Sequence, residues 1–235
     1  MSIFSGIAGA GAGFVMTPLA IVLGLSPAQA VSSGKFNGLA TTIGSLGGLR
    51  ARRSQIRVRL VASIMLLAFI IGLFVPGIIK AFDGQTYRLV LGIMLLLMIP
   101  IMIRKKVGLH PRHPSRLTRG VGGGLLALSL FLQGTFSGGL GSLVNIVLMG
   151  FLGQTANEAH ITKRWSQLIL NVTILFGVAG AGLIVWPVVA VGASANLIGS
   201  YIGGRIATRK GDAFALNVLL GLMTLSAGTL IVGAF

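Results

Sequence analysis

The chain of 235 residues contains no cysteine and only three acidic residues, Asp83, Glu158 and Asp212. Without cysteine it has no disulfide framework, no thiolate chemistry and no thiolate metal site. Three scattered carboxylates and three histidines offer no metal-ligand cluster, no catalytic triad and no paired carboxylates for acid–base catalysis. We therefore expect neither an enzyme nor a bound cofactor or metal, and the scarcity of carboxylates also counts against a cation exporter.

Charge of either sign is scarce, because only 9% of the residues are charged, against roughly 25% in soluble domains. The chain is 54% hydrophobic, its mean hydropathy is +0.94, and it contains 36 glycines. This composition is typical of helices that pack closely within a lipid bilayer. The net charge of +16 lies mostly in short loops between apolar segments, so we expect no nucleic-acid partner.

Apolar segments follow one another along the whole chain, and a membrane span needs about 20 such residues. The candidate spans are residues 3–24, 28–49, 60–80, 86–103, 120–152, 160–182, 184–204 and 213–234. The segment 120–152 is too long for one ordinary crossing and is interrupted by Gly134-Thr-Phe-Ser-Gly-Gly139. We expect an all-α polytopic membrane protein in which this segment forms a re-entrant hairpin whose break lines a site.

Basic residues gather in three clusters, at residues 50–59, 104–119 and 205–210. Basic loops remain on the cytoplasmic side of a membrane, so we expect all three there, in a multi-pass protein of the cell membrane.

The sequence contains an internal repeat, which is seen when it is shifted along itself so that Lys35 overlays Arg164. In this alignment the basic loop 50–59 lies opposite the uncharged segment 179–188. Such a reversal of charge indicates two inverted-topology repeats, each with a glycine-broken element and about three transmembrane helices. We expect a first repeat at 1–103, a basic linker at 104–119 and a second repeat at 120–235. Met1 aligns with residue 130, so the first repeat is expected to lack its N-terminal arm.

Three cations lie within the predicted helices: Lys35, Lys163 and Arg164. A cation at the centre of a spanning helix costs roughly 2.5–3.5 kcal/mol on insertion scales. Because no carboxylate lies nearby in the sequence, we expect an anionic substrate to be the partner, with Lys35 and Arg164 as equivalent ligands and Lys163 assisting. The alternative is that these side chains reach the headgroups or pair with the carbonyl end of a broken helix.

Glycines and hydroxyl groups complete the candidate substrate site. A helix that restarts after a glycine-rich break points free N–H groups at an anion. The candidates of this kind are Gly11, Gly13, Gly139, Gly141 and Ser142, and the hydroxyl groups of Ser33 and Thr162 overlay each other in the repeat. Close helix packing without a ligand is the alternative for both groups. His160 could carry a coupling proton, but a cap at the surface end of the helix is the favoured explanation.

A series of short motifs follows in order along the chain: Gly9–Gly13 with Pro18, Leu23–Pro27, Ala28–Ala30, Ser32-Ser33, Arg52–Arg57, Ser137–Ser142, Leu152-Gly153, Ala159–Lys163 and Gly199–Arg205. In the order and spacing of these motifs the chain resembles the sulfite exporter TauE/SafE family of membrane transporters. This resemblance implies a transporter of sulfite, a sulfonate or a related organic anion, with export as the implied direction.

From the residues and the resemblance together we predict a small-anion transporter that works by alternating access, with one half rocking against the other around a midplane site. An anion channel and a scaffold subunit that does not transport are the alternatives. Assembly with a second copy of the chain stays open.

Overall fold

The computed structural model of this chain describes residues 17, 20–48, 58–81, 85–87, 89–90, 93, 115–136, 140–154 and 156–210. Within these residues the regular structure is entirely helical, as predicted. The main helices are α3 (Pro27–Gly48), α4 (Val58–Ala81), α6 (Arg116–Phe136), α7 (Gly141–Gly150), α8 (Ala156–Ala179) and α9 (Trp186–Lys210). The spans expected at 3–24, 86–103 and 213–234 lie wholly or largely outside the described residues.

Short local signals determine where the helices begin. Before α3, the Ser26 hydroxyl accepts a hydrogen bond from the Gln29 backbone N–H, and the Gln29 side chain accepts one from the Ser26 N–H. This reciprocal pair is a capping box, and Pro27 occupies the first helical position, where a missing N–H costs nothing. The Ser115 hydroxyl similarly accepts from the Thr118 N–H at the start of α6.

Two helix boundaries recur at the interval by which the sequence was overlaid on itself. The start of α8 follows the start of α3 by the same interval that separates Lys35 from Arg164, and the end of α9 follows the end of α4 by that interval as well. Gly24 before α3 and Gly153 before α8 share this spacing, and their φ angles are 94° and 68°. An L-residue with a side chain rarely adopts this left-handed conformation, so both turns require glycine. The turn that leads into the helix is thus built in the same way in both halves.

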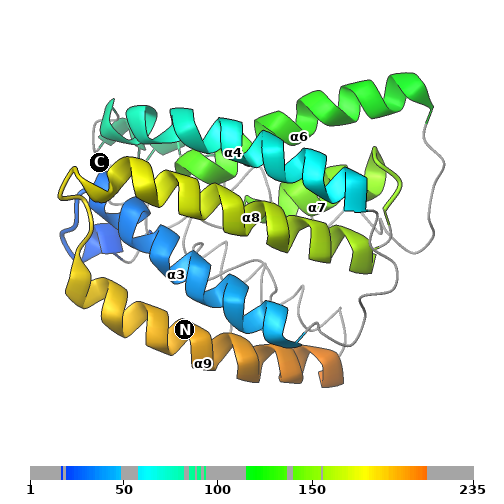
Figure 1. Cartoon of the computed structure of the whole chain (residues 1–235). Helices are drawn as coiled ribbons and strands as arrows, with labels where there is room; N and C mark the ends of the chain where they lie inside the picture. Colours follow the sequence, from blue (N-terminus) through cyan, green and yellow to red (C-terminus); the bar gives the residue numbers. More distant parts are fainter. Residues whose placement is uncertain are drawn as a thin grey trace.

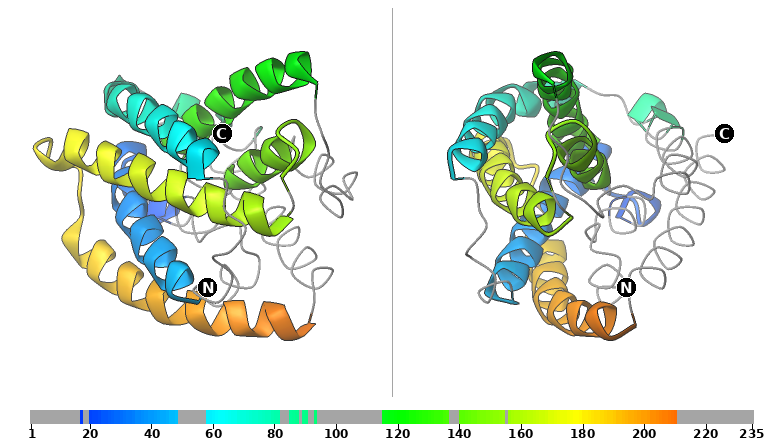
Figure 2. Two further views of the ribbon diagram at one scale, coloured as in Figure 1. Left: turned by 45° about the vertical axis from the view of Figure 1, so that its right-hand side comes forward. Right: turned by 90° about the vertical axis from the view of Figure 1, so that its right-hand side faces the viewer.

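The helices pack across the two halves of the chain. α3 lies mainly against α9, and α4 lies mainly against α8, while α3 and α8 cross between these pairs (Figure 1). Figures 1 and 2 show that α3 and α8 run in opposite directions, as do α4 and α9. α7 packs on α6 and turns back toward the end at which α6 begins, which is the hairpin expected from the sequence.

Many polar side chains are buried in the interior among apolar core residues, and large apolar side chains cover much of the outside. The buried polar residues include six on α3 and six on α8: Ser32, Ser33, Lys35, Asn37, Thr41, Thr42, Thr162, Lys163, Arg164, Ser166, Asn171 and Thr173. Exposed apolar side chains on α4 include Leu66, Phe69, Leu73 and Phe74. This arrangement suits lipid outside and a polar site inside.

Within the described residues, α4 is the one helix that is both long and apolar enough to cross a membrane by length and composition. α9 has a shorter apolar part, Trp186–Gly199. The polar side chains that α3 and α8 turn inward lower the hydropathy of these two helices.

The helix ends that border the three basic clusters lie at one end of the bundle. α3 ends and α4 begins beside residues 50–59, α6 begins beside 104–115, and α9 ends at Lys210. All four ends lie on the right in Figure 1. The described helix ends that adjoin the three clusters thus share one side of the bundle.

Candidate functional site

The break between α6 and α7 creates a helix N-terminus inside the protein. α6 ends at Phe136 and α7 begins at Gly141, after Leu140, which provides no side-chain cap. The first N–H groups of a helix have no partner within it, and they carry a partial positive charge. Leu140 is buried, so this N-terminus lies within the protein.

The side chains of Lys163 and Gln133 converge on Gly141. A Cβ atom built on Gly141 would lie 2.8 Å from Lys163 Cε, 3.0 Å from Lys163 Nζ and 3.1 Å from Gln133 Nε2. Lys163 and Gln133 are only 2% and 4% exposed. Two buried donors and a helix N-terminus therefore surround one glycine that leaves room for their close approach.

Lys35 reaches the same break from the opposite helix end. Its Nζ donates a hydrogen bond of 2.9 Å to the backbone carbonyl of Gln133, near the C-terminus of α6. The Tyr87 hydroxyl donates to the Thr135 carbonyl at 3.4 Å. The last carbonyls of a helix lack partners within it and carry a partial negative charge, so Lys35 stabilises this internal helix end. An ammonium group has three N–H donors, and among the described residues only one of those on Lys35 is used.

Gln133 accepts a hydrogen bond from Lys35 at its backbone carbonyl, and its side chain approaches the same glycine as Lys163. Within the described residues, neither Lys35 nor Lys163 forms an ion pair with a carboxylate. Arg164 is also buried, but it is not among the nearest neighbours of Gly141, and its Nε atom has no hydrogen-bond partner. The repeat overlaid Arg164 on Lys35, whereas the structure places Lys163 at the break. The three assignments as substrate ligands stay predictions.

Ser33 and Thr162 are held in other hydrogen bonds. The Ser33 hydroxyl accepts from the backbone N–H of Val185, just before α9, at 3.1 Å. The Thr162 hydroxyl accepts from Gln154 Nε2 at 3.0 Å. Both bonds join a helix to a neighbouring turn or helix start. This is what we expect if the two hydroxyl groups serve helix packing and do not bind a ligand.

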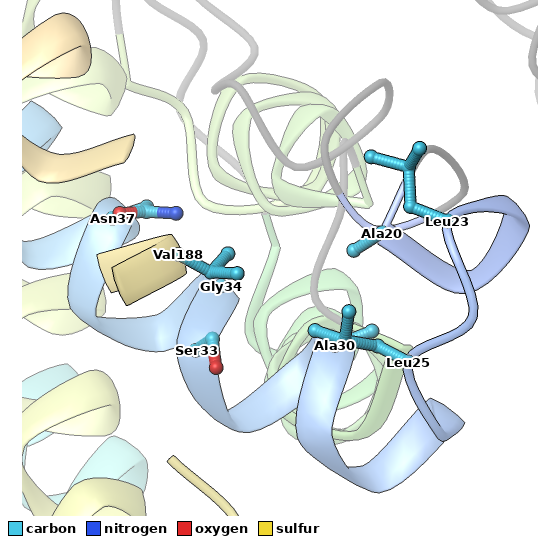
Figure 3. Close-up of a pocket in the computed structure, with 8 residues that line it drawn as sticks. All are labelled: Ala20, Leu23, Leu25, Ala30, Ser33, Gly34, Asn37 and Val188. Carbon is cyan, nitrogen blue, oxygen red and sulfur yellow. The ribbon is translucent and has the colours of Figure 1, made fainter. Parts of the chain in front are cut away.

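Ser33 also borders a small cavity of about 80 Å³ between α3, the start of α9 and the turn before α3 (Figure 3). Asn37 lies one helical turn further along α3 and lines the same cavity, with apolar residues around it. Ser33 and Lys35 are two positions apart, so they face different sides of α3. The structure therefore does not bring Ser33 to the break.

Several predicted ligands fall outside the description. Gly11, Gly13 and Gly139 lie outside the described residues, and the side chains of Ser142 and His160 are likewise not described. Gly141 is the predicted glycine whose surroundings are known, and it lies at the centre of the site.

The sequence analysis missed Gln133 and Tyr87. Gln133 directly precedes Gly134, where the long segment 120–152 was expected to break, and this was a usable signal. An amide at such a break can contribute both donors and an acceptor without adding charge. For Tyr87 the sequence has no comparable signal.

The helical fold, the buried cations and the exposed apolar side chains are features expected of a helical membrane protein. A family model described as "Sulfite exporter TauE/SafE" matches residues 1–230. The chain belongs to the sulfite exporter TauE/SafE family of membrane transporters.

A protein of Haemophilus influenzae, "Probable membrane transporter protein", is 26% identical over 217 residues, which cover 89% of this chain and 82% of that protein. No solved structure matches this chain.

Proposed function

We propose that this protein transports a small anion, such as sulfite, a sulfonate or a related organic anion, across the cell membrane. The observation that carries this proposal is the meeting of Lys35 and Lys163 at the break between α6 and α7, without a carboxylate partner among the described residues. Removing two cations from water costs several kcal/mol per ion unless an opposite charge compensates. A bound anion would supply that charge.

The bound anion would lie over Gly141, at the N-terminus of α7. Lys163 Nζ and the free N–H groups of α7 would donate to its oxygens, and the unused N–H donors of Lys35 would add to the local positive potential. Arg164 remains a candidate ligand, because the partner of its Nε atom is missing. The basic clusters beside the ends of α3, α4, α6 and α9 would face the cytoplasm.

We propose further that the two halves are inverted repeats. This idea is supported by the matching helix boundaries, the paired glycine turns and the opposite directions of equivalent helices. Transport would then alternate access to the break by relative movement of packed units. α3 packs mainly on α9, and α4 packs mainly on α8. We therefore infer that each moving unit contains one helix from each half of the chain, and that the two halves do not move as whole units against each other.

Uptake into proteoliposomes that contain the purified protein tests the anion site. Sulfite and a small organosulfonate are offered separately to the wild type and to Lys163→Met, Lys35→Met and Arg164→Met variants. Lys80→Met is the matched control, because Lys80 is an exposed lysine in the last turn of α4. We expect saturable uptake with counterflow, lost in Lys163→Met, weakened in Lys35→Met and unchanged in Lys80→Met.

Other outcomes separate the alternatives. Uptake without saturation or counterflow would identify a channel. Wild-type uptake in the Lys163→Met and Lys35→Met variants would remove the assignment of the site but leave a transporter. Absence of uptake for every anion offered would favour the scaffold alternative.

A further inference from the structure

Gln133 is buried next to the proposed anion position, yet part of its side chain has no hydrogen-bond partner. Its backbone carbonyl is used by Lys35, and its Nε2 atom lies beside Gly141 and Lys163. The Oε1 atom is buried and accepts no hydrogen bond. Most buried polar groups in proteins are satisfied, so an unsatisfied acceptor at a proposed site requires an explanation.

The missing partner must have two hydrogen-bonding functions. The Nε2 donor and the ammonium of Lys163 both lie close to Gly141, and neither donates a hydrogen bond to a described residue. They would be satisfied by an anionic oxygen. Oε1 would be satisfied by a hydrogen donor. A substrate that carries an anionic group and a hydroxyl group would provide both functions, and a bound water molecule is the competing explanation.

We propose that Gln133 determines substrate specificity by selecting small anions that carry a hydroxyl group, such as hydroxyalkyl sulfonates. The carboxamide donates through Nε2 to an oxygen of the anionic group and accepts the hydroxyl hydrogen at Oε1. This inference rests on the proposed transport of anions at the α6–α7 break. A site built to hydrogen-bond a hydroxyl group discriminates strongly against the analogue that lacks it, because its own polar group is then left unpaired.

The test compares two sulfonates of equal charge that differ by one hydroxyl group, 2-hydroxyethanesulfonate and ethanesulfonate. Their KM values for uptake into proteoliposomes are measured for the wild type, for Gln133→Met and for Asn196→Leu. Gln133→Met keeps the length of the side chain and leaves the backbone carbonyl available to Lys35. Asn196→Leu removes another fully buried amide, on α9, whose side-chain atoms also lack partners.

We expect the wild type and Asn196→Leu to prefer 2-hydroxyethanesulfonate by about tenfold or more in KM. Gln133→Met is expected to transport both sulfonates with similar KM values. If Gln133→Met does not fold, Gln133→Glu replaces it. This variant keeps an acceptor and loses the Nε2 donor, so it should retain the preference while its KM rises for both sulfonates.

The possible failures are distinguishable. Equal KM values of the two sulfonates in the wild type would overturn the role of Gln133, with water as the partner of Oε1, and would leave anion transport standing. An unchanged preference in Gln133→Met would have the same meaning for Gln133. Absence of saturable uptake of either sulfonate would overturn this inference, whereas the proposed function would fall with it only if sulfite were not taken up either.

Discussion

Substitution of Gly141 by alanine tests the geometry of the break most directly. The added methyl group would lie 2.8 Å from Lys163 Cε and 3.1 Å from Gln133 Nε2, where ordinary van der Waals contact begins near 3.4 Å. The end of the Lys163 side chain must therefore move away, and the Gln133 Nε2 atom must shift by a smaller distance. Both are ends of flexible side chains, so the methyl group displaces the ligands with little strain on the backbone.

The effect on stability and the effect on transport should therefore separate. Displacing flexible side-chain ends costs at most about 1 kcal/mol of stability, and the higher helix propensity of alanine offsets part of that cost. Loss of one charge-assisted hydrogen bond to the anion costs about 1.5–3 kcal/mol, which corresponds to roughly 10- to 150-fold in binding. We expect the KM of anion uptake to rise by about this factor while the thermal midpoint in detergent changes by only a few degrees.

The matched control is Gly150→Ala, at the other end of α7, where an added Cβ meets no atom within 4 Å. It should leave both uptake and thermal midpoint near the wild-type values. Wild-type KM in the Gly141→Ala variant would refute the placement of the substrate over Gly141. A large loss of thermal stability in this variant would show that the space over Gly141 serves packing instead.

Two further substitutions test the packing between helices. In Gly177→Ala the new methyl group would overlap with Pro76 Cγ on α4, and the rigid ring cannot move aside, so we expect a loss of about 1–3 kcal/mol of stability. Gly77→Ala has open space and should leave the thermal midpoint unchanged; equal midpoints for both variants would contradict the tight contact. Because the chain has no cysteine, a disulfide between Gly38→Cys and Asn171→Cys would join α3 to α8 alone. We expect this cross-link to stop uptake and its reduction to restore it, and full uptake by the cross-linked protein would refute movement of α3 against α8.

Much of the helical arrangement was predictable from local patterns. The apolar segments 28–49 and 160–182 lie within a few residues of α3 and α8, because helix length in a bilayer and the turns at Gly24 and Gly153 are encoded by neighbouring residues. The break near Gly134–Gly139 was expected because no single span could contain 120–152. The common side of the helix ends that adjoin the basic clusters likewise follows from the order of the spans.

The composition alone also determined the class of protein. A chain with 9% charged residues and three carboxylates cannot form an ordinary soluble surface, and its buried cations must find partners other than acidic side chains. The order and spacing of its motifs indicated the transporter family, to which it belongs.

Only the tertiary structure decided which polar groups meet. Lys35 donates a hydrogen bond to the backbone carbonyl of Gln133, which is 98 residues away in the chain. No pattern in the sequence predicts this pairing. The overlay of the repeats paired Lys35 with Arg164, but adjacent residues on a helix point about 100° apart, so the rotation of α8 against α7 brought Lys163 to Gly141 instead. Local sequence determines where a helix begins and ends, whereas the packing of whole helices determines which of its faces meets the break.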